Sequence, residues 1–167
     1  MKRYSLKNNY QILLCTLLAS YTLPSSAATF ERLESKPLDE LWLTAGFYSF
    51  HFEPDQPLED NNIGAGLEYR YSTTSAFVAG RFRNSEKIIS SYAAAYWQPL
   101  ALGPVRLGAL VGVINGYNSA NNGNWFPLAL PMATTEYKRI GISLTIVPSI
   151  QNVVHGSISL QLRVKLF

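Results

Sequence analysis

Apolar and polar residues alternate with a period of two along much of this chain, and this pattern limits the fold more than any other feature. In the stretch 157–166, every even-numbered residue from Ile158 to Leu166 is apolar, whereas the odd-numbered residues are Ser, Gln, Arg or Lys. Residues 140–146, 105–113 and 63–71 repeat the pattern. Segments of about ten residues that alternate in this way are typical of membrane β-barrel strands, which face lipid on one side and the lumen on the other.

Eight segments of this kind can be counted, and the connections between them alternate between longer polar stretches and mostly shorter ones. An even number of antiparallel strands, with long connections at one end and short turns at the other, is the arrangement of bacterial outer-membrane barrels. We therefore expect an all-β fold, an eight-stranded antiparallel outer-membrane β-barrel over residues 41–167. The expected strands are about 41–52, 62–72, 75–83, 89–98, 104–114, 125–133, 139–147 and 156–166.

A soluble β-sandwich or lipocalin-like barrel is the alternative, with the apolar face turned inward. The charges on the opposite face argue against it, because a packed soluble core does not hold so many. We expect these side chains to point into the lumen: Glu68, Arg70, Arg81, Arg106, Arg163 and Lys165. Aromatic residues near strand ends fit an interfacial belt: Trp42, Tyr71, Tyr92, Trp97, Trp125 and Tyr137.

The first 28 residues have the pattern of a secretory signal peptide, with three basic residues, a short apolar run and small residues before Thr29. Removing 28 of the 167 residues leaves 139, with 11 basic and 11 acidic side chains and no cysteine, because Cys15 leaves with the signal. A neutral chain offers little electrostatic support for a nucleic-acid partner. The expected location is the outer membrane of a Gram-negative bacterium, and the expected state a monomer.

Residues 29–40 form an expected periplasmic segment before the barrel. Thr29 is placed to cap a short amphipathic helix that Pro37 would end. A disordered leader is the alternative.

The lumen is expected to be plugged by charges in its periplasmic half and roomier in its outer half. Small residues at presumed inward positions would vacate that space, or would only ease curvature: Gly64, Gly66, Ala93, Ala95, Gly108, Gly112, Gly141 and Ser143. Pro127 and Pro131 cannot donate to a strand ladder, so they predict a stretch where pairing lapses and a lipid chain could enter sideways; the alternative is a longer loop.

The candidate catalytic residues on this reasoning are His51 and Ser85. His51 ends one rising strand on its expected inward phase, and Arg83-Asn84-Ser85 ends another at the same side of the barrel. A histidine beside a serine hydroxyl can act as general base in acyl transfer. The alternative for His51 is a polar residue at the rim of the barrel without a catalytic role. His155, in the last long connection, is a weaker candidate. No metal or cofactor site is expected, because the two histidines and the carboxylates are scattered.

The stretch 124–133, Asn-Trp-Phe-Pro-Leu-Ala-Leu-Pro-Met-Ala, resembles a segment of the lipid A palmitoyltransferase (PagP) family. Residues 146–148, 97–100 and 41–45 are also similar, so that the resemblance spans about 41–167. It implies an eight-stranded outer-membrane barrel with an interior acyl pocket. The implied reaction moves a palmitoyl chain from a glycerophospholipid to lipid A.

The resemblance carries Ser85 over directly, and it implies Asn84, which stands where the family has Asp, as a third candidate catalytic residue. An ungapped alignment puts Ser49 at the family's histidine, and one gap restores His51, which lies two residues on. An Asn can orient a histidine by hydrogen bonding but not as an anion. The leading hypothesis is therefore an outer-membrane acyltransferase with phospholipid as donor and lipid A as acceptor. A lipid A or phospholipid esterase and a non-enzymatic structural or adhesive barrel are the alternatives.

Overall fold

The computed structural model describes residues 29–53, 55, 57–150 and 154–167. The expected signal peptide, residues 1–28, lies outside the described residues. The elements in chain order are β1 Phe30–Arg32, β2 Pro37–His51, β3 Asn61–Ser72, β4 Ser75–Arg83, β5 Ile89–Leu102, β6 Val105–Ile114, the 3-10 helix η1 Asn121–Gly123, β7 Phe126–Tyr137, β8 Ile140–Val147 and β9 Ser157–Lys165. Within this part of the chain, no helix is long and apolar enough to cross a membrane.

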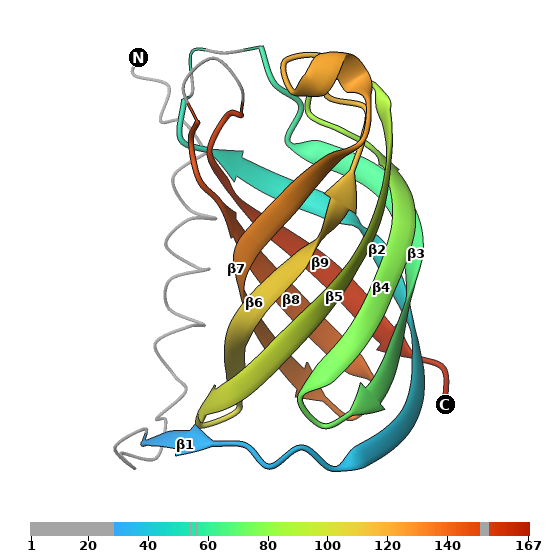
Figure 1. Cartoon of the computed structure of the whole chain (residues 1–167), viewed down its shortest axis with the longest axis vertical. Helices are drawn as coiled ribbons and strands as arrows, with labels where there is room; N and C mark the ends of the chain where they lie inside the picture. Colours follow the sequence, from blue (N-terminus) through green and yellow to red (C-terminus); the bar gives the residue numbers. More distant parts are fainter. Residues whose placement is uncertain (1–28, 54, 56, 151–153) are drawn as a thin grey trace, which may run out of the picture.

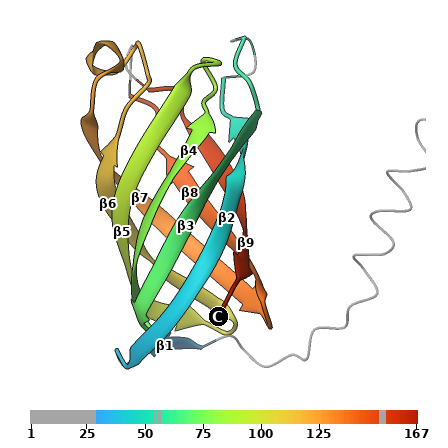
Figure 2. The ribbon, with the colours of Figure 1, turned by 90° about the vertical axis from the view of Figure 1, so that its right-hand side faces the viewer.

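Strands β2 to β9 form a closed antiparallel barrel, which confirms the predicted fold class. Their order around the sheet is β5-β4-β3-β2-β9-β8-β7-β6, and pairing of β5 with β6 closes it. The connections β2–β3, β4–β5, β6–β7 and β8–β9 lie together at one end, which we call the loop end (Figures 1 and 2). The short turns, β1 and the C-terminus lie at the other, the turn end. Each predicted strand overlaps an observed one, and β2, β5 and β7 run four residues further at the turn end than predicted.

Residues 30–32 form a strand, so the prediction of a helix after Thr29 is wrong. β1 pairs with the last residues of β5, from Phe30 opposite Leu102 to Arg32 opposite Leu100. β4 pairs with β5 only as far as Trp97, opposite Ser75. Beyond that point one edge of β5 needs a partner for its backbone groups, and β1 supplies it.

The barrel wall separates an apolar outer surface from a polar and charged interior. Outward side chains in the middle of the strands are large, apolar and exposed, such as Leu67, Val111, Ile142 and Leu162. This is the surface expected of a barrel immersed in lipid.

Several predicted orientations are corrected. In β5, Ala93 points outward and Ala94 inward between the buried Tyr92 and Tyr96. The run of three alanines is apolar on both phases, so alternation could not choose between them; Ala95 shares the outward phase of Ala93. Arg81 is exposed on the outside, near the loop end.

The predicted aromatic belt is also partly wrong. Trp42 and Tyr92 lie inside the barrel, with exposed fractions of 1% and 9%. The Trp42 ring stacks against inward cations, with the Arg163 guanidinium 5.1 Å from its centroid. The remaining members are exposed, as a belt requires: Tyr71, Trp97, Trp125 and Tyr137.

An ion-pair network fills the turn-end half of the lumen, as the sequence predicted. Arg163 Nη1 lies 2.6 Å from Glu68, with both side chains 1% exposed, and Glu68 also accepts a 2.7 Å hydrogen bond from the Tyr96 hydroxyl. Arg70 Nη1 lies 2.8 Å from Glu136 and 3.1 Å from Glu40. The members of this network, which we call the lumen plug, are Glu40, Glu68, Arg70, Arg106, Glu136, Arg163 and Lys165.

Candidate functional site

A β-bulge in β2 decides which of its residues face the lumen near the loop end. Before the bulge, Trp42 and Thr44 point inward; after it, Ser49 does. The register of β2 shifts between Ala45 and Phe47 against β3, and between Thr44 and Phe47 against β9. One extra residue exchanges the two faces of a strand. His51 therefore lies on the lumen side.

Glycine at position 46 makes this bulge tight. A Cβ there would lie 2.0 Å from the carbonyl oxygen of Asn62 and 2.5 Å from the nitrogen of Gly64, both backbone atoms of β3. Those atoms cannot give way without breaking the sheet. The sequence therefore allows the close approach only with glycine at this position.

His51 connects a serine and a carboxylate. Its Nε2 lies 2.9 Å from Ser85 Oγ, and its Nδ1 lies 2.9 Å from Asp60 Oδ1. A carboxylate can only accept, so Nδ1 carries the proton of the neutral ring and donates it to Asp60, and Nε2 accepts from the Ser85 hydroxyl. This is the hydrogen-bond order of a Ser-His-Asp triad. The His51 side chain is 7% exposed and that of Asp60 54% exposed.

The structure thus brings His51 and Ser85 together, as predicted, but it gives Asn84 a different environment. The Asn84 side chain is fully buried. Its Nδ2 donates to Ser90 Oγ at 2.9 Å and to the Gly116 carbonyl at 2.7 Å. Its Oδ1 accepts from the backbone N–H groups of Glu86 and Ile88. These bonds use both ends of the amide, so Asn84 shapes the loop that presents Ser85 and does not orient His51.

Asp would be a poor residue at position 84. An ionised carboxylate could accept from the two loop N–H groups, but it would repel the Gly116 carbonyl, which needs a donor. Asn rather than Asp therefore fits the contacts at this position. The carboxylate that faces the histidine comes instead from Asp60, at the end of the β2–β3 loop.

Asn62 is a second polar side chain, besides His51, that contacts the Ser85 hydroxyl. Its Nδ2 lies 3.4 Å from Ser85 Oγ and 3.2 Å from the Glu59 carbonyl, and its Oδ1 accepts from Ser49 Oγ at 2.8 Å. Ser49 Oγ lies 3.0 Å from Ser159 Oγ. A buried line of polar side chains therefore runs from Ser159 on β9 through Ser49 on β2 and Asn62 on β3 to Ser85 at the loop end.

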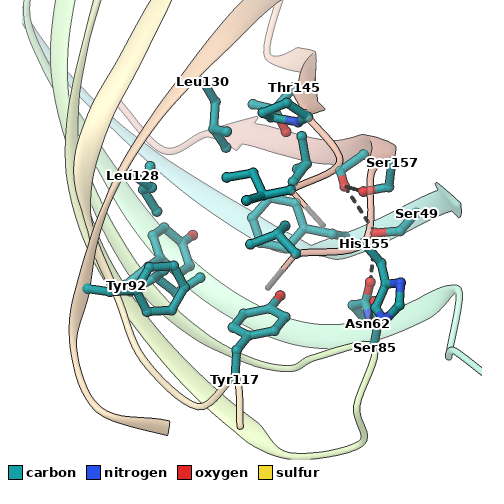
Figure 3. Close-up of a pocket in the computed structure, with 18 of the residues that line it drawn as sticks. Ser49, Asn62, Ser85, Tyr92, Tyr117, Leu128, Leu130, Thr145, His155 and Ser157 are labelled. Atoms are coloured by element: carbon teal, nitrogen blue, oxygen red, sulfur yellow. Dashed lines mark hydrogen bonds between the residues drawn. The ribbon is translucent and has the colours of Figure 1, made fainter. Parts of the chain in front are cut away.

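These groups lie at one side of a cavity of about 260 Å³ in the loop-end half of the lumen. In Figure 3, Ser49, Asn62 and Ser85 lie on one side of this cavity, with Tyr92, Leu128 and Leu130 on the other. The apolar side chains that line it include Ala94, Leu110, Ile114, Phe126, Leu128 and Leu130. The site thus combines an apolar chamber with a short polar wall, which suits an aliphatic chain that ends in a polar group.

The barrel wall beside this cavity has incomplete strand pairing. β7 pairs with β6 from Phe126, opposite Ile114, to Thr135, but it pairs with β8 only over Met132–Tyr137. Pro127 and Pro131 lie outside the β7–β8 pairing, which confirms the predicted lapse. The two prolines are four residues apart, so the N–H groups that they lack would point toward the same neighbouring strand. Because the ladder between β7 and β6 is complete in this stretch, that neighbour is β8.

A second histidine–carboxylate pair joins two loops over the cavity. His155 Nδ1 is hydrogen-bonded to the Glu53 carboxylate, and the Phe52 N–H donates to the Gly156 carbonyl at 2.9 Å. The hydrogen bond from His155 holds the pKa of Glu53 below its ordinary value. The β2–β3 and β8–β9 loops are therefore fastened together while Glu53 is ionised.

We expect this contact to be lost in acid. Because the folded-state pKa of Glu53 is lowered, its contribution is present above the ordinary glutamate range and disappears as the pH falls through the lowered value. The measurement is the hydrogen-exchange protection factor of the Phe52 amide, corrected for intrinsic rates, between neutral pH and pH below that range. In the Glu53→Gln variant the protection should be lower and independent of pH. An equal, pH-independent protection in both proteins would contradict the assignment.

Sequence reasoning places Asp60 and Asn62 only among the polar groups near His51 and Ser85 and assigns neither of them a contact. Asn62 lies on the inward phase of β3 with Gly64, Gly66 and Glu68, so alternation alone predicts that it faces the lumen. Asp60 precedes the strand, and its approach to His51 depends on the loop path. Among the described residues, no group of three or more His, Cys, Asp or Glu side chains is placed to hold a metal ion.

Comparisons with known proteins support the fold alone. No family model matches the chain, and no curated protein matches it. Among solved structures, it is similar to a chain from a study of de novo designed transmembrane β-barrels. That match has a TM-score of 0.54 and 12% sequence identity, and covers 80% of this chain and 100% of the designed one. The protein is therefore a transmembrane-type β-barrel.

Proposed function

We propose that the protein is an outer-membrane acyltransferase that moves a palmitoyl-type chain from a glycerophospholipid to lipid A. The observation that carries the proposal is the Asp60–His51–Ser85 relay at the side of an apolar cavity. A hydrogen-bonded base and hydroxyl supply acyl-transfer chemistry, and the cavity suits the acyl chain of the donor.

In the first step His51 removes the Ser85 proton through Nε2 as Ser85 Oγ attacks the ester carbonyl of the phospholipid. Asp60 stabilises the imidazolium that forms. The bond between the carbonyl carbon and the glycerol oxygen breaks, and His51 gives its proton to that oxygen. The products are a lysophospholipid and an acyl chain esterified to Ser85.

In the second step a hydroxyl group of lipid A takes the place of the glycerol oxygen. His51 removes its proton, the hydroxyl oxygen attacks the acyl ester, and Ser85 leaves with the proton. The acyl chain remains in the apolar cavity during both steps. Its position then needs no change while donor and acceptor exchange.

The pairing lapse between β7 and β8 offers the donor chain a route from the membrane into the cavity. Leu128 and Leu130 line the cavity from the same stretch of β7 whose outward neighbours include Pro127 and Ala129. Backbone groups that lack a ladder partner in this stretch can separate at lower cost than those in the complete ladders elsewhere. The loop end would face the outer leaflet, where lipid A lies.

Hydrolysis is a second candidate, favoured by the exposure of Asp60. Its side chain is 54% exposed, so water reaches the rim beside His51. Water as acceptor would convert the same chemistry into that of a lipid A or phospholipid esterase.

The test reconstitutes the protein in vesicles that contain lipid A and a phospholipid with an isotope-labelled acyl chain. Mass spectrometry of the lipids should show labelled, more highly acylated lipid A and an equal amount of lysophospholipid. Free labelled fatty acid without acylated lipid A would identify the esterase. Unchanged lipids would reject both enzymatic proposals and leave the structural or adhesive barrel.

The bulge gives a further prediction for this assay. A Gly46→Val substitution should abolish the bulge, because a Cβ at this position would lie 2.0 Å from the Asn62 carbonyl oxygen. Simple alternation along the unchanged number of residues would then turn His51 away from the lumen. Acyl transfer should fall as far as in a variant without His51, while the barrel still shows heat-dependent migration in gels. Ala45→Val, at the exposed neighbouring position of β2, is the matched control. A Gly46→Val variant that keeps wild-type activity would contradict the assigned role of the bulge.

A further inference from the structure

We propose that the Asn62 side-chain amide is a catalytic residue that stabilises the oxyanion formed when Ser85 attacks an acyl ester. The inference rests on the proposed function and deepens it. It assigns to a residue of β3 a task that the Ser85, His51 and Asp60 side chains do not perform.

The orientation of the Asn62 amide is fixed by its partners. The Glu59 carbonyl, at 3.2 Å, can only accept a hydrogen bond, so the nitrogen faces it. Ser49 then donates to the oxygen at 2.8 Å. The same nitrogen lies 3.4 Å from Ser85 Oγ, and it has a second hydrogen that Glu59 does not use.

In the resting protein this second N–H makes only a weak hydrogen bond. A 3.4 Å contact to a hydroxyl is long for a hydrogen bond, and Ser85 Oγ already donates to His51 at 2.9 Å. The donor is thus held beside the reacting oxygen without a strong partner of its own. Such a group can bind more tightly to the transition state than to the ground state, and only that difference accelerates the reaction.

The charge that needs stabilising arises as follows. The Ser85 proton moves to His51 Nε2, a bond forms between Oγ and the carbonyl carbon, and the carbonyl π electrons move to the carbonyl oxygen. That oxygen becomes an anion one bond from the carbon that Oγ attacks, within reach of a donor held near Oγ. Because Asn62 is 2% exposed and the cavity walls are largely apolar, a fixed donor there is worth far more than one in water.

Ser49 is a positioning residue in this arrangement. It is 4% exposed, and it receives support from Ser159 on β9. Its bond to Oδ1 keeps the Asn62 amide from turning over. The Ser159 and Ser49 hydroxyls on the cavity wall therefore hold the proposed oxyanion donor in one orientation.

The experiment uses an alkyl fluorophosphonate, which reacts with a nucleophilic serine whatever the natural acceptor is. Ser85 Oγ bonds to phosphorus, fluoride leaves, and the phosphoryl oxygen takes up negative charge on the way. Asn62→Ala should slow this reaction about 100- to 1,000-fold, the usual effect of removing one oxyanion donor. Asn62→Asp, which keeps the shape but lacks the N–H, should slow it at least as much, and Ser49→Ala should slow it less.

The matched control is Asn61→Ala, the exposed neighbour of Asn62 on β3. All variants are compared in heat-dependent gel migration to confirm that the barrel forms. With a phospholipid substrate, Asn62→Ala should lower kcat and leave KM within a few-fold, because the donor acts on the transition state. A merely structural role for Asn62 would instead raise KM or weaken the barrel.

The outcomes separate this inference from the proposed function. If Asn62→Ala and Asn62→Asp react with the fluorophosphonate as fast as Asn61→Ala, the oxyanion role is overturned while acyl transfer can stand. If the wild-type protein is phosphonylated at Ser85 and depends on Asn62 but transfers no chain to lipid A, the acceptor assignment fails and the oxyanion role stands. A wild-type protein that is not phosphonylated at Ser85 overturns both.

Discussion

Replacement of Ser85 by Ala is expected to lower kcat for acyl transfer by about 10⁴-fold or more while the barrel folds normally. In the proposed mechanism the hydroxyl is the group that His51 activates, at a distance of 2.9 Å, and no methyl group can replace it. Its loss leaves the cavity and the loop that Asn84 shapes in place, so substrate binding should persist. Initial rates with labelled phospholipid and lipid A in vesicles give the measurement.

His51→Ala should cost about as much, and the double variant little more than either single one, because residues that act as a unit are not additive. Ser91→Ala is the matched control, since Ser91 lies near the same end of the barrel but on the other phase of β5 from the buried Ser90. Asp60→Asn should lower kcat less than either, because its exposed carboxylate is screened by water. Full activity in Ser85→Ala would remove the serine from the mechanism.

The Glu68→Ala variant is expected to lose about 3–5 kcal/mol of the free energy of unfolding. The change leaves the Arg163 guanidinium, which is 1% exposed, without its 2.6 Å partner, and it takes the acceptor of Tyr96 as well. Arg163 Nε already has no hydrogen-bond partner among the described residues. Urea or guanidinium unfolding in lipid vesicles, followed by tryptophan fluorescence, measures the effect.

The control is Glu34→Ala, which removes an exposed pair with Lys36 and should change the free energy of unfolding by less than about 1 kcal/mol. Replacing Glu68 and Arg163 together by apolar residues of similar volume should recover much of the loss, since no charge then stays unpaired. A single Glu68→Ala variant as stable as the control would show that the lumen plug admits enough water to solvate Arg163.

The barrel could be predicted from the sequence because contact with lipid restricts the residue types along the whole outer face. Lipid demands apolar residues at the outward positions within the hydrocarbon layer, so alternation repeats over many strands, as from Ile158 to Leu166. The pairing lapse was also predictable, because Pro127 and Pro131 each remove a donor whatever the surroundings. Where apolar residues occupy both phases, as in the three alanines of β5, the constraint disappears and the prediction was wrong.

The site was less predictable because it depends on loops and on one bulge. His51 and Ser85 could be assigned to the same end of the barrel from strand direction alone. The partner of His51 could not, because Asp60 reaches it through the path of the β2–β3 loop, which no periodicity encodes. The expected role of Asn84 rested on the resemblance, which puts it where the PagP family has Asp, whereas the side chain bonds to its own loop and to the Gly116 carbonyl.

The lumen plug has a consequence for the membrane as an electrical barrier. A protein that admits lipid through its side wall interrupts the apolar layer that keeps ions from crossing. Here the interrupted part of the wall, beside Pro127 and Pro131, borders a chamber whose other end is filled by mutually paired charges such as Arg163 and Glu68. The chamber is therefore closed at that end, and under the proposed function a hydrocarbon chain would enter through the wall without connecting the two aqueous compartments.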